Sequence, residues 1–243
     1  MSGAAPTRSV AFLVTCEHGG NRVPARWRPL FERATDVLAS HRGWDAGALP
    51  LGRAVARALD APLRAATITR LLVDLNRSPH NPRVFSEWTR GLRREDRIEL
   101  LGRWHAPHRA AVEADVVGLG AGRGVRVVHL AIHSFTPSLD GVTRRADLAL
   151  LYDPRRRRER ALCAAWAAAL GESLPDLAVR RNQPYRGASD GLTTWLRRRH
   201  PAEAYLGIEI EVNQRLLGET GRFPPDIANA LARGLEQALR SGG

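Results

Sequence analysis

Two histidines directly follow predicted strands, where their side chains are available for chemistry. His18 comes after the apolar segment Val10–Thr15, in the sequence Glu17-His18-Gly19-Gly20. His133 comes after the nearly continuous apolar segment Val125–Ile132. Paired glycines let a backbone turn sharply and approach a ligand closely. Imidazole and carboxylate groups in such turns suit metal binding or acid–base chemistry, but a structural role for Glu17 and His18 fits the pattern equally well.

Acidic residues occur at two further positions that suit the same chemistry. Asp45 precedes a predicted helix, Ala48–Leu59, so it is either the cap of that helix or a carboxylate ligand. Glu209 and Glu211 lie in and just after the apolar strand Tyr205–Ile210, and strand alternation places both on one face. Two such acids are costly unless they are paired, which indicates a functional role or an arginine partner.

The segment Thr69–Ser78 combines an apolar run with polar residues at its end. Leu71–Leu75 is interrupted only by Asp74, and Asn76-Arg77 follows it before a proline-containing turn. A short apolar run bounded by turn residues predicts a buried strand. Asn76 and Arg77 then lie at its carboxyl end, where open α/β sheets bind ligands. In the alternative, Asp74 pairs with a nearby arginine and Arg77 is a solvated loop residue.

Three other groups of polar residues carry weaker signals. The predicted helix Glu95–Ala114 contains His105 and His108 at a spacing that suits a metal, but Pro107 and the surrounding charges favour an exposed or lid-like segment. We interpret His41 as structural. The loop 180–191 is dense in groups that bind anions and donate hydrogen bonds.

These residues need a scaffold of alternating strands and helices. The chain has 243 residues, of which 44% are hydrophobic, enough for one sizeable core. Strand-like and helix-like segments alternate, so the fold class is α/β, and no linker divides residues 1–243 into more than one domain. Beyond the strands named above, the pattern predicts strands at Leu63–Ile68, Leu148–Tyr152 and Leu177–Val179 and a final helix at Pro225–Arg240.

The charge of the chain permits an anionic partner. The net charge is +12, and all 37 basic residues are arginine, which we attribute to a GC-rich genome. Such a charge suits an anionic substrate or weak adhesion to nucleic acid. The densest run, Arg155–Arg160, opens a predicted helix without interleaved aromatic residues, so we interpret it as a solvated helix face and do not favour nucleic acid as the partner.

Composition also bears on where the protein acts. No apolar run approaches the roughly 20 residues of a membrane span. No apolar segment with a cleavage site precedes the first strand, so we expect no signal peptide. Cys16 and Cys163 are the only cysteines, which indicates reduced thiols and a cytoplasmic protein.

Taken in order, several of these motifs resemble the N-formylglutamate amidohydrolase family. The resemblance covers most of the chain and is carried by Cys16–Pro24, Gly43-Trp44-Asp45, Thr69-Arg70, Asp74–Arg77, Ile132–Phe135, Asn182–Gly187 and Ile210–Asn213. It implies a fold similar to zinc carboxypeptidases, a mixed and mostly parallel sheet flanked by helices, with a metal at the strand ends. The carboxypeptidase pattern has a glutamate three residues after the first histidine, and here that residue is Asn21.

The resemblance and the residue types together give a predicted site. His18, Asp45 and His133 are assigned to zinc, with Glu17 as the alternative third ligand, because Asn21 is a poor one. Glu211 is assigned as the general base, since Glu211-Val212-Asn213 fits the family's pattern better than Glu209 does. An arginine, Arg77 or alternatively Arg70, stabilises the oxyanion. The predicted substrate-binding residues are Arg70, Asn76, Ser134, Arg181, Asn182, Tyr185 and Arg186.

The resulting expectation is a zinc-dependent amidohydrolase that cleaves the amide of a small anionic substrate, an N-formyl or similar N-acyl derivative of an acidic amino acid. Two alternatives stay open at this point. One is a metallopeptidase or amidase of the same fold with another substrate, and the other is a non-enzymatic, arginine-rich nucleic-acid-binding protein. The sequence does not give the oligomeric state.

Overall fold

A computed structural model describes residues 9–122 and 124–241. Its strands are β1 (Val10–Cys16), β2 (Leu63–Ala65), β3 (Arg126–Phe135), β4 (Ser138–Leu139), β5 (Val142–Thr143), β6 (Leu148–Leu151), β7 (Val179–Arg181) and β8 (Tyr205–Asn213). Its α-helices are α1 (Thr35–Ala39), α2 (Ala48–Ala58), α3 (Arg94–Leu100), α4 (Ala106–Leu119), α5 (Arg157–Ser173), α6 (Leu192–Arg197) and α7 (Pro225–Ser241). Short 3₁₀ helices span Ala25–Phe31 and Gln214–Leu216, and a π-helical turn spans Leu101–His105.

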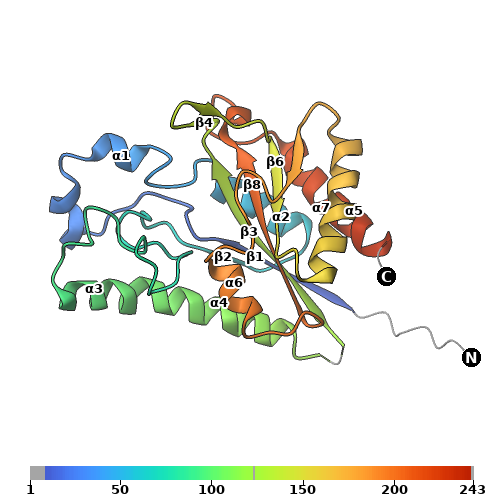
Figure 1. The fold of residues 1–243 in the computed structure, drawn as a ribbon, viewed down its shortest axis with the longest axis horizontal. Helices are drawn as coiled ribbons and strands as arrows, with labels where there is room; N and C mark the ends of the chain where they lie inside the picture. The colour runs from blue at the N-terminus through green and yellow to red at the C-terminus, as the bar shows by residue number, and fades with distance from the viewer. Residues whose placement is uncertain (1–8, 123, 242–243) are drawn as a thin grey trace, which may run out of the picture.

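Six strands form one mixed, mostly parallel sheet in the order β2-β1-β3-β8-β6-β7, which confirms the predicted fold class (Figure 1). β2, β1, β3 and β8 run parallel to one another, whereas β6 is antiparallel to β8. The carboxyl ends of β1, β3 and β8 therefore meet at the same edge as the amino end of β6. Ligand sites of open α/β sheets lie outside this edge.

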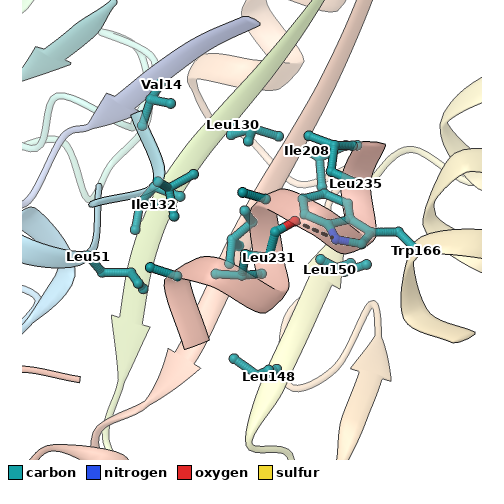
Figure 2. Close-up of a cluster of buried hydrophobic side chains, with 14 of the residues drawn as sticks. Val14, Leu51, Leu130, Ile132, Leu148, Leu150, Trp166, Ile208, Leu231 and Leu235 are labelled. Atoms are coloured by element: carbon teal, nitrogen blue, oxygen red, sulfur yellow. Dashed lines mark hydrogen bonds between the residues drawn. The ribbon is translucent and has the colours of Figure 1, made fainter. Parts of the chain in front are cut away.

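One face of the sheet is mostly apolar. Residues of even number in β3 and β8, such as Leu130, Ile132 and Ile208, point to the face that α2, α5 and α7 cover (Figure 2). The indole nitrogen of Trp166 in α5 donates a hydrogen bond to the backbone oxygen of Leu231 in α7, at 3.0 Å. This satisfies the one polar atom that Trp166 brings into the core.

The opposite face carries the polar residues. Because side chains alternate along a strand, His129, His133, Glu209 and Glu211 all share it. Helices α4 and α6 cover only part of this face, through an apolar cluster made of Leu13, Val112, Val116, Val127, Leu192, Leu196 and Tyr205. The shared face of Glu209 and Glu211 is as predicted, and His133 proves to lie within β3, whose regular part ends only at Phe135.

A second hydrophobic core lies beside the sheet, in what we call the side lobe, residues 19–45 and 66–105 (Figure 1). Its buried residues include Trp27, Phe31, Leu72 and Leu100. The predicted strand Leu71–Leu75 is wrong: these residues form turns in this lobe. They are buried because they fill its core, and the Asp74 N–H donates to the Val84 oxygen at 2.8 Å instead of to a strand.

The helical segment that begins in this lobe is longer and more buried than predicted. α3, the π turn and α4 run consecutively from Arg94 to Leu119. His105 is buried, and its Nε2 lies 2.7 Å from the Arg77 backbone oxygen. The exposed or lid-like character expected for this segment is therefore wrong around His105. Pro107 lies where the π turn passes into α4, so its missing N–H falls at a break in the α-helical hydrogen-bond pattern.

The arginine-rich run at the start of α5 is only partly a solvated face. Arg155, Arg157, Arg158 and Arg160 are exposed, as expected. Arg156, however, donates to the backbone oxygens of Tyr205, Arg197 and His200. Glu159 is buried against Arg197, with oxygen–nitrogen distances of 3.0 and 3.1 Å. Part of the run therefore joins α5 to α6 and β8. Within the described residues, no helix is both long and apolar enough to cross a bilayer.

Candidate metal centre

The first histidine is positioned by the turn that follows β1. The backbone N–H of Gly19 donates to the Ala66 oxygen at 3.0 Å. A Cβ atom on Gly19 would come within 2.9 Å of that oxygen, and one on Gly20 within 2.7 Å of the Thr67 oxygen. Only glycine fits against this backbone, so the two glycines hold the turn that presents His18. Their close approach is to the chain itself and not to a ligand.

Three donor atoms converge in the interior at the strand ends. His18, Asp45 and His133 are all buried, and each offers one ligand atom within 4.8 Å of the others. Asp45 Oδ2 lies 3.3 Å from His18 Nδ1 and 2.9 Å from His133 Nδ1. Ligands of a tetrahedral zinc with bonds of roughly 2.0–2.1 Å lie about 3.3 Å apart. The spacing and the N, N, O donor set therefore fit a zinc ion.

Asp45 does not cap the following helix. The N-cap position of α2 is Gly47, with φ of 78°, and no described side chain makes a capping hydrogen bond there. The Asp45 side chain instead contacts the two histidines and Arg70. Of the two readings of Asp45, the ligand reading is the one that its contacts support.

The outer nitrogens of both histidines face carboxylates. His18 Nε2 lies 2.8 Å from Asp74 Oδ1, and His133 Nε2 lies 3.2 Å from Glu17 Oε2. Histidines that bind metals usually donate their other N–H to a carboxylate, which fixes the ring and the tautomer. Glu17 thus faces the ring nitrogen of His133 that is turned away from Asp45. Asn21 is exposed and donates to the Leu38 oxygen at 3.0 Å, outside the cluster.

The charged groups of this cluster shift one another's pKa values. Burial alone would raise the pKa of Asp45, but the two histidines and Arg70 hold it well below its usual range. Burial alone would lower the pKa of His133, yet Asp45 and Glu17 raise it well above the ordinary value. A cation bound at His133 Nδ1 would displace a proton, so metal binding there would be coupled to proton release.

Glu211 lies next to this cluster. In the register of the parallel pair β3–β8, Glu211 is the partner of His133. Its side chain is buried, and its Oε2 has no hydrogen-bond partner among the described residues. Burial raises the pKa of Glu211 to about 8, against the lowering effect of His133. A carboxyl group whose pKa lies near neutrality suits proton transfer. Glu209 instead accepts a hydrogen bond from the Thr193 hydroxyl at 2.7 Å.

Two of the predicted arginines border the cluster. Arg70 bridges two carboxylates, with distances of 3.3 Å to Asp45 Oδ1 and 2.9 Å to Asp74 Oδ2. Asp74 therefore pairs with a nearby arginine, as one of the two sequence interpretations had it. Asp74 also contacts His18. Arg77 donates to the Asp190 backbone oxygen at 3.0 Å, and its Nε lies 4.0 Å from Asp74 Oδ2.

The backbone of Asn76 and Arg77 is held from α4 and from the loop before α6. Arg109 donates to both backbone oxygens, at 3.2 and 2.7 Å. The Asn76 side-chain oxygen accepts from the Leu192 N–H at 2.7 Å. Asp190 Oδ2 accepts from the Ser78 N–H at 2.9 Å. These bonds fix the backbone from which the Arg77 side chain extends, without any strand.

Of the other predicted substrate-binding residues, Asn182 and Ser134 serve the framework. The Asn182 side-chain oxygen accepts from the backbone N–H groups of Tyr152 and Gly187. Ser134 Oγ donates to the Ala46 oxygen at 2.7 Å. Arg181 is exposed at the end of β7, and the exposed side chain of Arg186 makes no hydrogen bond or ion pair with any described residue. The structure does not bring these four residues into the cluster.

Burial and the charges of Glu211 and Asp45 raise the pKa of Tyr185, which contacts an arginine that the sequence pattern did not single out. Arg144 Nη1 donates to the Tyr185 hydroxyl at 2.7 Å. Sequence reasoning named His108 only for its spacing with His105 and did not place it near Glu17, whose Oε1 lies 3.7 Å from His108 Nε2. Neither residue stands at the end of an apolar run, so strand-end reasoning gave no signal for them. The i, i+3 spacing of His105 and His108 was the only pattern that touched this region.

Known structures share this fold. A gene product of Agrobacterium tumefaciens is 29% identical with a TM-score of 0.80, and the match covers 96% of this chain and 92% of that one. An N-formylglutamate amidohydrolase from Ralstonia eutropha is 20% identical with a TM-score of 0.61, over 97% and 94% of the two chains. No curated protein sequence matches. The family model for N-formylglutamate amidohydrolase matches residues 10–217. The chain therefore belongs to the N-formylglutamate amidohydrolase family and is a hydrolase of amide bonds.

Proposed function

We propose that the protein is a zinc-dependent amidohydrolase that removes a formyl or similar acyl group from an acidic amino acid. The observation that carries this proposal is the buried cluster of His18, Asp45 and His133 with Glu211 beside it in the β3–β8 register. Its donor set, the distances between donor atoms and the carboxylates behind both histidines all suit zinc.

In this account, His18 Nδ1, Asp45 and His133 Nδ1 hold the metal. When bound, zinc supplies a water of lowered pKa, roughly 7, and polarises the carbonyl of the scissile amide. Glu211 accepts the proton of the attacking water and later delivers it to the leaving amine. The low exposure of Glu211, 8%, keeps bulk water from competing for that proton.

Arg77 and Arg70 differ in how available their side chains are to the substrate. Within the described residues, the Arg77 side chain makes one hydrogen bond, to the Asp190 oxygen, and its nearest carboxylate is 4.0 Å away, so its donors are available to an oxyanion or a carboxylate. Arg70 is engaged by Asp45 and Asp74, which makes it the weaker candidate for direct substrate contact. The Asn76 side-chain oxygen accepts a hydrogen bond from the Leu192 N–H, so Asn76 offers its amide N–H groups to the substrate.

A panel of matched substrates tests this function. The zinc-loaded protein is assayed with formyl, acetyl and succinyl derivatives of glutamate, aspartate, glutamine and leucine, and with short peptides. We expect hydrolysis of the acidic N-acyl amino acids, with the formyl derivatives preferred. Turnover of peptides alone would replace this proposal by the peptidase reading, and steeply salt-dependent binding to nucleic acid without any turnover would favour the non-enzymatic one.

We further propose a single cytoplasmic domain. Two features support this reading: the family model covers residues 10–217 without interruption, and both cysteines are buried and unpaired. Buried free thiols are usual where the surroundings keep cysteine reduced. Fractionation of cells that produce the protein tests the location.

A further inference from the structure

Arg144 lies at the edge of the sheet where β3 and β8 end, between the β4–β5 hairpin and β6. Its backbone N–H donates to the Pro137 oxygen at 2.8 Å. The segment that follows is tied to the end of β8, because the Asn213 side chain donates to the Ala146 oxygen at 2.8 Å. Asn213 is two residues beyond Glu211 on the same strand. The backbone of Arg144 is thus anchored close to the proposed base.

Two aromatic rings hold the Arg144 guanidinium. Its central carbon lies 5.5 Å from the centre of the Phe135 ring and 5.0 Å from that of the Tyr185 ring. The two rings meet edge to face, with centroids 6.5 Å apart. Phe135 is two residues after His133 on β3, so both side chains point to the same face of the sheet. This places the guanidinium on the face of the sheet that carries the candidate metal centre.

The Arg144 cation has no acidic partner among the described residues. Its one side-chain hydrogen bond goes to the Tyr185 hydroxyl, whereas a guanidinium has five N–H donors. Arg70 differs, because Asp45 and Asp74 already neutralise it. An arginine held by neutral aromatic groups next to a catalytic site keeps its charge and its fork of donors for a ligand.

The electrostatics agree with this location. Burial raises the pKa of Tyr185, and the charges of Glu211 and Asp45 raise it further, whereas the charge of Arg144 lowers it. Tyr185 therefore lies within electrostatic reach of both the proposed base and the proposed metal ligand. The same cation, together with Arg42 and Arg70, contributes to the lowered pKa of His41, whose largest cause is burial.

We propose that Arg144 determines substrate specificity by binding the side-chain carboxylate of an N-acylated acidic amino acid. This deepens the function proposed above and depends on it. An N-acyl glutamate carries two carboxylates, and Arg77 with Asn76 accounts for only one of them. Arginine pairs with carboxylates through two parallel hydrogen bonds, which an uncharged amide side chain cannot match.

The test compares two nearly isosteric substrates, N-formylglutamate and N-formylglutamine, in matched variants. Arg144→Gln removes the charge, Arg144→Lys keeps it without the fork, and Arg145→Gln is the control because Arg145 is the exposed neighbour. We expect Arg144→Gln to lower kcat/KM for the glutamate substrate about 10- to 100-fold, mostly through KM, and to leave the glutamine substrate nearly unchanged. Arg144→Lys should lie between, and Arg145→Gln should match wild type.

Equal losses on both substrates, or equal effects of Arg144→Gln and Arg145→Gln, would overturn the proposal. Zinc content and thermal melting confirm that each variant is folded and loaded. A binding measurement separates this proposal from the proposed function. If the wild type hydrolyses neither substrate, calorimetry with glutarate and butyrate still applies, because they differ by one carboxylate. Two results would contradict the carboxylate site whatever the reaction is. In one, glutarate binds the wild type no better than butyrate does. In the other, glutarate binds Arg144→Gln as well as it binds the wild type.

Discussion

Four buried carboxylates lie in one small region, and their contacts give them different roles. Asp45 touches the Nδ1 atoms of both histidines, whereas Asp74 and Glu17 face the Nε2 atoms. Glu211 has no hydrogen-bond partner for its Oε2 among the described residues. Sequence reasoning selected Asp45 from its place after the Gly-Trp turn, and it selected Glu211 over Glu209 because Glu211-Val212-Asn213 resembles the family's pattern. It could not separate Glu17 from Asp45 as the third ligand, because that depends on which side of the His133 ring each one occupies.

Glu211 carries the first prediction at this scale. Glu211→Gln keeps the size of the side chain but removes the base, so kcat should fall by about 10²–10⁴ while zinc stays bound. Glu209→Gln is the matched control, because its carboxylate is bonded to Thr193. The measurement is kcat at equal zinc content. Near-normal turnover of Glu211→Gln together with loss in Glu209→Gln would reverse the assignment.

Glu17 carries the second prediction. Its carboxylate oxygens lie 3.2 Å from His133 Nε2 and 3.7 Å from His108 Nε2, and neither makes a hydrogen bond of good geometry. If Glu17 orients His133 and is not itself a ligand, Glu17→Gln should bind zinc about 10- to 100-fold more weakly without losing the site. Competition with a chelator measures this affinity. Complete loss of zinc in Glu17→Gln would instead make Glu17 a ligand.

Among the elements, strands were easier to predict than the segments between them. Val10–Cys16, Arg126–Phe135 and Tyr205–Asn213 are long apolar runs, and each forms a strand close to the predicted bounds. Leu71–Leu75 has the same composition but fills the side-lobe core as turns. Burial explains the apolar residues in both cases, and only tertiary contacts decide between strand and turn.

His129 in β3 gives a pH prediction. It is buried between the Thr15 hydroxyl at 2.8 Å and the Tyr205 hydroxyl at 2.7 Å, and burial lowers its pKa to about 4. Above about pH 6.5, the histidine is neutral in both folded and unfolded chains, so it adds no pH dependence. Below that pH, the unfolded chain takes up the proton first, so stability falls as the pH drops towards the folded pKa, by up to about 3 kcal/mol.

His129→Gln removes this dependence. As the pH is lowered from about 7 to 4, the unfolding free energy of the wild type should therefore fall relative to that of His129→Gln. Urea unfolding at several pH values measures it. Exposed His80→Gln is the control and should show no such shift. A difference that stays constant over this range contradicts the neutral, buried state of His129.

At the scale of the whole molecule, the candidate site lies where the side lobe meets the sheet. His133 and Glu211 come from the sheet, whereas Asp45 and Asp74 come from the side lobe. The sequence predicted the sheet class because alternating strands and helices leave few alternatives. It could not predict the side lobe, whose core is assembled from short turns and single apolar residues far apart in the chain.

Zinc stoichiometry tests the central claim most directly, because the proposed ligands come from both parts of the molecule. Elemental analysis of the purified wild type should give one zinc per chain. His18→Ala, His133→Ala and Asp45→Ala should each lose most of it, whereas His41→Ala, an exposed histidine, should keep it. Full zinc occupancy in both His18→Ala and His133→Ala would contradict the account. Occupancy kept only in Asp45→Ala would move the third ligand to Glu17.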